Sequence, residues 1–153
     1  MDWFVRAFIK ASVAWLAVGV TLGVGMAINQ PWVVYRTAHI HINLLGFVGM
    51  MIFGVGYHVL PRIAGHALLR PRLAAAHWWL ANIGLGLFAG GFVLRAHGAA
   101  AAPAALGAGA ALSAAGAYAF AWNIWRTLSA AGAHHAPPPR EGHAPRRPLP
   151  MAG

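Results

Sequence analysis

The stretch YRTAHIHINLLGFVGMMIFGVGYHVLPR, residues 35–62, decides the fold. Between Arg36 and Arg62 it contains no Asp, Glu, Lys or Arg. A helix needs about 20 consecutive apolar residues to cross a bilayer, so this segment is long enough to do so. It nevertheless carries three histidines, His39, His41 and His58. Because polar side chains are expensive inside a membrane, these histidines are candidates for function.

The composition predicts an integral membrane protein. The 153-residue chain is 59% hydrophobic and only 8% charged, whereas soluble domains carry about 25% charged residues. The only acids, Asp2 and Glu141, lie near the ends, which excludes carboxylate catalysis, carboxylate proton relays and carboxylate-rich cation sites in the apolar body. The absence of cysteine excludes disulfides, iron–sulfur clusters, thiolate zinc and covalently attached heme. The nine histidines are the remaining chemically versatile groups.

Four segments free of Asp, Glu, Lys and Arg each meet the length of a spanning helix: residues 11–35, 37–61, 73–94 and 96–125. We therefore expect an all-α, four-helix transmembrane bundle over residues 1–130. Residues 131–153 are rich in Pro, His and Arg and cannot build a core. They are predicted to form a disordered tail.

The basic residues predict the orientation in the membrane. Of the 11 Lys and Arg residues, only Arg36 and Arg95 lie at the predicted outer ends of helices. The excess on the other side places both termini in the cytoplasm of a bacterial inner-membrane protein. The net charge of +9 does not indicate nucleic-acid binding, because no folded polar domain presents it.

His39 is the strongest candidate for a cofactor ligand. With about 3.6 residues per turn, it shares one helix face with Arg36 and Gly46, the face predicted to point into the bundle. A neutral imidazole next to a gap left by a glycine suits the iron of a heme. Arg36, one turn nearer the outer surface, suits a heme propionate. The alternative without a cofactor is a histidine near a helix end that hydrogen-bonds at the level of the lipid headgroups.

The other histidines have weaker claims. His41 falls on the opposite face, which is predicted to face lipid, so His39 and His41 do not form a chelate on a regular helix. His97 lies toward the outer side at the end of the third segment. Imidazoles on that side also suit copper or zinc. On the inner side, His58 and His77 are expected to hydrogen-bond the backbone or each other, and the tail histidines are expected to be solvated.

Two small-xxx-small patterns, GVTLG at residues 19–23 and GLFAG at residues 86–90, indicate close helix packing. Ordinary packing within the bundle is the simplest interpretation. The alternatives are room for a flat cofactor or contact between copies in a homo-oligomer.

Residues 35–62 resemble the second transmembrane helix of subunit I in the heme-copper oxidase superfamily, and are similar above all to C-family cytochrome oxidases and nitric oxide reductases. The motif RTAH supplies Arg36 and His39, and GYHVLPR supplies Tyr57, Pro61 and Arg62. The resemblance extends over residues 4–95. It implies that His39 is an axial ligand of a low-spin heme b, while a register shift of two would place His41 there.

The chain also departs from that family. The late helix that carries the second axial histidine, and the histidines of the binuclear centre, have no counterpart here. We therefore expect no reduction of oxygen or nitric oxide by this chain alone. Three sources remain open for the second ligand: His97, a histidine from a second copy, or a vacant position that binds a gas.

The sequence thus leads to three hypotheses. The first is a homo-oligomeric membrane protein that binds heme b through His39 and acts in electron transfer or in sensing nitric oxide or oxygen. The second is a membrane protein that binds copper or zinc through outer-side histidines. The third is a non-catalytic assembly subunit that packs against a respiratory-chain partner. All three place the protein in the lipid bilayer.

Overall fold

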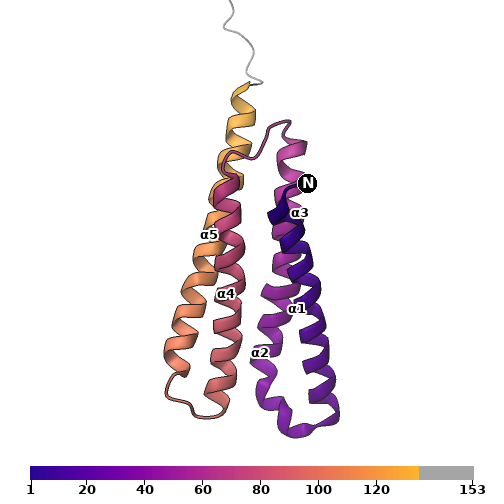
Figure 1. Ribbon diagram of the computed structural model, residues 1–153, viewed down its shortest axis with the longest axis vertical. Coiled ribbons are helices and arrows are strands. Elements are labelled where there is room, and N and C mark those ends of the chain that lie inside the picture. Colours follow the sequence, from indigo (N-terminus) through magenta and orange to yellow (C-terminus); the bar gives the residue numbers. More distant parts are fainter. Residues whose placement is uncertain (135–153) are drawn as a thin grey trace, which may run out of the picture.

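The computed structural model describes residues 1–134, and helices joined by short loops make up this part of the chain (Figure 1). Four helical stretches are long and apolar enough to cross a membrane: Trp3–Ile28, Gln30–Ile63, Pro71–Ala96 and Ala102–Ala130. These stretches confirm the expected all-α membrane fold.

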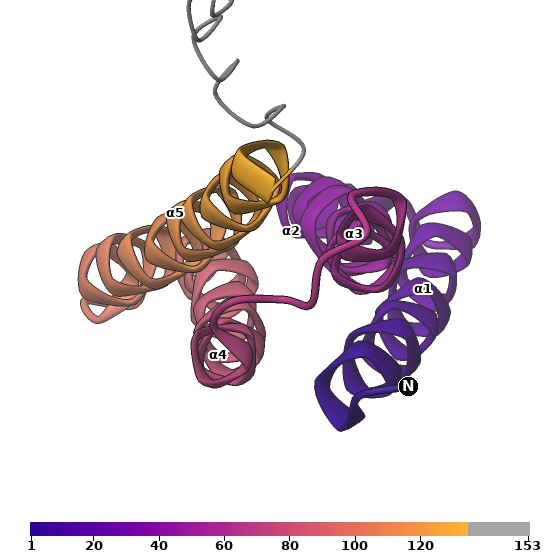
Figure 2. The same ribbon diagram turned by 90° about the horizontal axis from the view of Figure 1, so that it is seen from above.

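The helices form two antiparallel hairpins. The first pairs α1 (Trp3–Ile28) with a continuous helical stretch composed of η1 (Gln30–Tyr35), α2 (Arg36–His41), η2 (Ile42–Gly49) and α3 (Met50–Ile63). The second pairs α4 (Pro71–Ala96) with α5 (Ala102–His134). Figure 1 shows that α1 begins at the end of the bundle where α5 finishes, as an even number of crossings requires. Viewed from above, α3 lies between α1 and α5 (Figure 2).

Two helix boundaries differ from the expected ones. Helix α1 begins at Trp3 rather than at residue 11, because Arg6 and Lys10 are long enough to extend their charges toward the headgroups from the first turns. Helix α5 continues to His134, past the expected boundary at residue 131. The rest of the predicted tail, residues 135–153, lies outside the described residues.

The second spanning stretch is not a uniform α-helix. Between α2 and α3, residues Ile42–Gly49 form a π-helix, in which hydrogen bonds span five residues instead of four. The predicted interior face survives this change, since Gly46, Met50 and Tyr57 are buried. Long π-helical segments are rare in proteins. Those that do occur are often found at functional sites. This one follows directly after His39 and His41.

The core lies nearer the end that carries the N-terminus. Phe8 of α1 is fully buried, and its ring packs against Phe53 and Tyr57 of α3 and His77 of α4. The hairpin α4–α5 is held by close backbone approach. A Cβ atom added at Gly84 would lie 2.7 Å from the main-chain nitrogen of Ser113, so only glycine permits this separation.

Candidate functional site

His39 is held by α1, the neighbouring helix of the first hairpin. Its Nδ1 atom lies 3.0 Å from the main-chain oxygen of Gly19. A carbonyl oxygen only accepts hydrogen bonds, so Nδ1 carries the ring hydrogen and donates it. The Nε2 atom is then the unprotonated nitrogen, which is the form that ligates a metal.

Two neighbours fix the His39 ring further. A Cβ atom added at Gly23 would lie 3.0 Å from Cε1 of His39, so a glycine at this position lets the ring approach α1. Asn43 donates to the main-chain oxygen of His39 at 2.9 Å, and its amide nitrogen lies 3.5 Å from Nε2. The Gly19–Gly23 pair therefore packs α1 against His39 and Asn43 within one chain.

His39 opens onto a groove of about 470 Å³ at the end of α1 and the start of α2. The residues that line it are Gly23, Met26, Ala27, Val33, Arg36, His39 and Ile40. Pockets for small molecules and cofactors typically occupy about 300–1,000 Å³. Arg36 and His39, paired from the sequence, thus share one groove.

Gly46 plays a different part from the one expected. A Cβ atom added there would lie 2.7 Å from Cβ of Trp15 and 2.9 Å from a methyl carbon of Leu85. The space beside this glycine is therefore filled by side chains of α1 and α4. The gap for a flat cofactor that we expected at Gly46 is closed by helix packing.

His41 faces α4 and not lipid, which corrects the expectation for this residue. Its ring stacks on Phe92 with ring centroids 4.9 Å apart and meets the edge of Phe88 at 4.8 Å. Its Nδ1 atom donates to the main-chain oxygen of Thr37 at 2.8 Å. The cause of the difference is that α2 contacts both α1 and α4, so two of its faces are covered. Val48 of η2 and Ile52 and Val59 of α3, which were expected to share the lipid-facing side with His41, are exposed.

His97 does not line the groove at His39. It follows the last residue of α4, is exposed, and its Nε2 atom lies 2.8 Å from the hydroxyl oxygen of Tyr35. Tyr35 precedes Arg36 directly, so this contact joins the outer end of α4 to the start of α2. Within one chain, the structure does not bring His97 and His39 into one site.

The inner histidines have separate partners. His77 is fully buried, and its Nδ1 atom lies 3.1 Å from the hydroxyl oxygen of Tyr57. His58 accepts a hydrogen bond at Nδ1 from Arg62 at 2.7 Å. The ring partners of His77 and His58 are thus the side chains of Tyr57 and Arg62, whereas the two alternatives expected from the sequence were the backbone or each other. The tail histidines His134, His135 and His143 lie outside the residues whose side chains are described.

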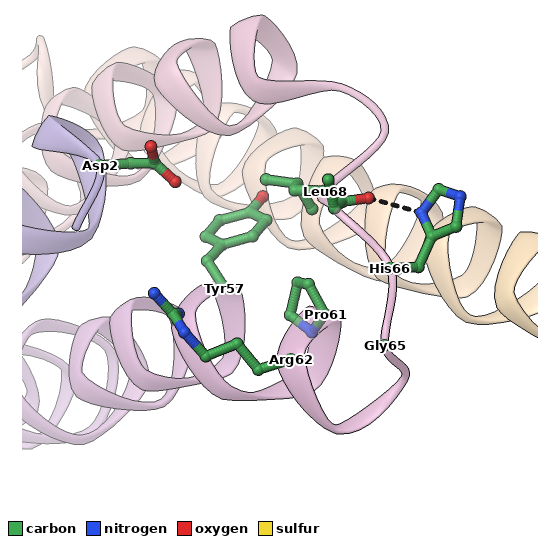
Figure 3. A pocket seen from close by; sticks show the side chains of 8 residues that line it. Asp2, Tyr57, Pro61, Arg62, Gly65, His66 and Leu68 are labelled. Carbon is green, nitrogen blue, oxygen red and sulfur yellow. Dashed lines mark hydrogen bonds between the residues drawn. The ribbon is translucent and has the colours of Figure 1, made fainter.

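Figure 3 shows a second pocket, of about 390 Å³, from close by. Its lining residues place it at the opposite end of the bundle from the His39 groove. Tyr57, Pro61 and Leu68 form its apolar part, and Asp2, Arg62 and His66 bring polar groups to it. Figure 3 shows the His66 ring directed at the oxygen of Ala67, to which it is hydrogen-bonded. The pocket is a cleft beside the loop that joins α3 to α4.

In the described part of the chain, no three side chains of His, Cys, Asp or Glu gather as metal ligands. The contributions of Gly23 and Asn43 to the site were missed from the sequence. The spacing of four between His39 and Asn43 was a usable signal, because residues four apart are neighbours on a helix. The contact with Gly23 depends on how α1 packs on α2, which the sequence does not specify.

Comparison with known proteins gives a consistent result. The family model "Cytochrome C and Quinol oxidase polypeptide I" matches residues 4–140. The chain is 39% identical over 56 residues to cytochrome c oxidase subunit 1 of Rhodobacter capsulatus, a match that covers 36% of this chain and 10% of that protein. It is 30% identical over 87 residues to the Cbb3-type cytochrome c oxidase subunit CcoN1 of Stutzerimonas stutzeri, with coverage of 53% and 18%.

The chain therefore spans less than a fifth of the length of either of these relatives, as the coverage of 10% and 18% shows. The family match takes in all four helical stretches that are able to span a membrane. Together, the helical fold and these matches describe a multi-pass protein of the bacterial inner membrane that belongs to the family of cytochrome c and quinol oxidase polypeptide I.

Proposed function

We propose that this chain binds a b-type heme through His39 and uses it to transfer electrons or to sense a diatomic gas such as nitric oxide or oxygen. The observation that carries the proposal is the hydrogen bond from Nδ1 of His39 to the oxygen of Gly19. It leaves Nε2 as the unprotonated ring nitrogen, the form that ligates iron, and a hydrogen bond of this kind on the other nitrogen orients the ring and raises its basicity.

The donor set of the groove suits heme better than copper or zinc. A porphyrin supplies four nitrogen ligands of its own, so a single imidazole is enough to attach it at an axial position. A zinc site takes three or four protein ligands. The groove lining contains one histidine, His39, and no Cys, Asp or Glu. This favours the heme hypothesis over the copper or zinc alternative.

Arg36 supports the same assignment. It lies in the lining of the groove with His39, one helical turn closer to the outer end of α2. A guanidinium group pairs well with a carboxylate such as a heme propionate. The remaining lining is apolar, with Met26, Val33 and Ile40 among its residues, and this suits the porphyrin ring.

The heme and the residues around it would have separate roles. The heme, when bound, supplies the one-electron or gas-binding chemistry of its iron. His39 would hold the iron, Gly19 and Asn43 would orient the imidazole, and Arg36 would pair with a propionate. We do not extend the proposal to oxygen reduction, because the chain corresponds to only 10% and 18% of the two oxidase subunits it matches.

The absorption spectrum of the purified full chain tests the proposal. We expect a Soret band and a b-type pyridine hemochrome that are lost in His39→Ala. His41→Ala is the matched control, because His41 also donates Nδ1 to a main-chain oxygen but faces α4. A His39→Ala protein that keeps a full complement of heme, or a wild-type protein that binds none, would contradict the proposal.

A further inference from the structure

The groove at His39 is open on the side that faces away from the bundle. Val33 and Ile40, which line it, are 45% and 46% exposed. The His39 side chain lines this groove and is half-buried, and its Nε2 atom lies 3.5 Å from the amide nitrogen of Asn43. A heme attached there would have one face toward His39 and the other toward the surroundings of the protein.

From this geometry we infer that the heme lies between two copies of the chain, each of which contributes His39 to one face of the iron and Arg36 to one propionate. The inference rests on the heme site proposed above and adds to it the partner and the second axial ligand. It is carried by the symmetry of the cofactor, the charge of the groove and the positions of the other outer-side histidines.

The symmetry argument begins with orientation. Two copies of one chain insert into the membrane in the same direction, because the same distribution of Lys and Arg directs both. A closed dimer is related by a two-fold axis, which must then lie along the membrane normal. If this axis passes through the iron and lies in the porphyrin plane, it exchanges the two faces of the heme. Each face then receives an identical His39.

The same axis also relates the two propionates, which are equivalent by the approximate two-fold symmetry of the porphyrin itself. Arg36 lies one turn from His39 toward the outer end of α2, and both line the groove. In the dimer, two Arg36 side chains therefore meet two propionates at the outer edge of the heme. The two positive charges balance the two negative charges, and this match favours a shared heme over one heme per chain.

The other outer-side histidines are engaged elsewhere within the chain. His97 lies outside the groove lining, and its Nε2 atom contacts the hydroxyl of Tyr35. His41 stacks on Phe92 of α4. Of the outer-side histidines in the described residues, His39 is the one that lines the groove, so the second axial imidazole comes most directly from the same residue of the second copy.

The small side chains of α1 permit this approach. Gly23 and Ala27 line the α1 side of the groove, and the His39 ring packs over Gly23, so Ala27 is the small side chain against which a planar ligand can lie. Val20 and Val24 on the same helix are 53% and 55% exposed and offer an apolar surface to the porphyrin edge or to the second copy.

The test measures heme content, coordination and mass on the full chain in nanodiscs. We expect one heme per two chains, a six-coordinate low-spin spectrum and the mass of a dimer. His41→Ala should leave all three unchanged. Co-expression of differently tagged wild-type and His39→Ala chains, followed by tandem purification, isolates the mixed dimer. We expect its heme to be five-coordinate, and added imidazole should restore the six-coordinate spectrum.

The outcomes separate the two proposals. One heme per chain, a six-coordinate heme in a monomer, or a mixed dimer with an unchanged six-coordinate spectrum overturns the shared site and leaves His39 as a heme ligand. Heme binding that is independent of His39, or no heme binding at all, overturns both. The imidazole response distinguishes loss of a ligand from misfolding of the variant chain.

Discussion

The hydroxyl oxygen of Tyr57 on α3 lies 3.1 Å from Nδ1 of His77 on α4 and so links the two hairpins of the bundle. His77 is fully buried, and its ring is surrounded by Phe8, Phe53 and Phe120 at centroid distances of 4.8, 4.5 and 6.0 Å. Its Nε2 atom is buried without a hydrogen-bond partner. The pair therefore joins helices from both halves of the chain through one polar contact in an aromatic core.

Tyr57→Phe should lower the free energy of unfolding by roughly 0.5–2 kcal/mol, because it removes the hydroxyl group and leaves Nδ1 of His77 unpaired as well as Nε2. The measurement is unfolding in mixed micelles with increasing SDS. The matched control is Tyr118→Phe, since Tyr118 is 76% exposed and its substitution should change little.

A double variant tests whether the contact between Tyr57 and His77 causes this loss of stability. Replacing both partners of a buried hydrogen bond by apolar groups of similar shape is nearly neutral or stabilising. Tyr57→Phe combined with His77→Phe should therefore recover most of the stability lost in Tyr57→Phe alone. Simple addition of two losses would show that the contact between Tyr57 and His77 is not what stabilises this part of the core.

The long apolar segments made the fold predictable, because length and composition alone decide whether a helix can span a bilayer. The interior face of the second spanning stretch was also predictable, since Gly46, Met50 and Tyr57 are buried as its period requires. Helix ends were predicted less well. Charged residues such as Lys10 mark the edge of an apolar run, although the helix itself continues past them.

The candidate site was predictable only in part. The spacing of Arg36 and His39 placed both in one groove, because residues three apart share a helix face. The surroundings of His41 and Gly46 were not predictable, since they depend on which helices pack against α2. A single helix period separates an inner from an outer face, whereas α2 is covered on two sides.

Gly84→Ala should separate α4 from α5. The new Cβ atom would lie 2.7 Å from the main-chain nitrogen of Ser113, and a backbone atom cannot move aside as a flexible side chain can. We expect a loss of about 1–3 kcal/mol in the free energy of unfolding. Gly90→Ala on the same helix is the control, because a Cβ atom there meets nothing within 4 Å. Equal stability of the two variants would contradict the packing described here.

The topology can be tested by cysteine labelling, because the natural chain has no cysteine. Ala67 lies in the loop between α3 and α4, Ala100 lies in the turn between α4 and α5, and both are exposed. We expect a membrane-impermeant maleimide to label Ala100→Cys in spheroplasts and Ala67→Cys only in inverted vesicles, since the excess of Lys and Arg remains inside. The reverse pattern would place Arg36 and the His39 groove on the cytoplasmic side.

His97→Ala should leave heme content and coordination unchanged. His97 lies outside the groove, and its hydrogen bond and ring contact with Tyr35 are at the surface, so its removal takes away surface contacts. The absorption spectra of the oxidised and reduced protein provide the measurement. Conversion of a six-coordinate spectrum to a five-coordinate one would instead identify His97 as the second axial ligand and would exclude the shared site between two copies.

Gly23→Ala should weaken heme binding without unfolding the bundle. The added methyl group would lie 3.0 Å from Cε1 of His39, so the ring must turn or retreat from α1 and its hydrogen bond to the oxygen of Gly19 must lengthen. We expect roughly a tenfold lower affinity, which corresponds to about 1.4 kcal/mol. Heme titration of the apoprotein measures the affinity, and the melting temperature of the apoprotein reports folding.

Gly86→Ala is the matched control for this last prediction. It makes the same substitution in another spanning helix, at a glycine where a Cβ atom meets nothing within 4 Å. Alanine favours a helix over glycine by up to about 1 kcal/mol, so this variant should melt at the same or a slightly higher temperature and bind heme normally. If both glycine variants bind heme equally well, the position of the His39 ring against α1 does not determine its affinity for the iron.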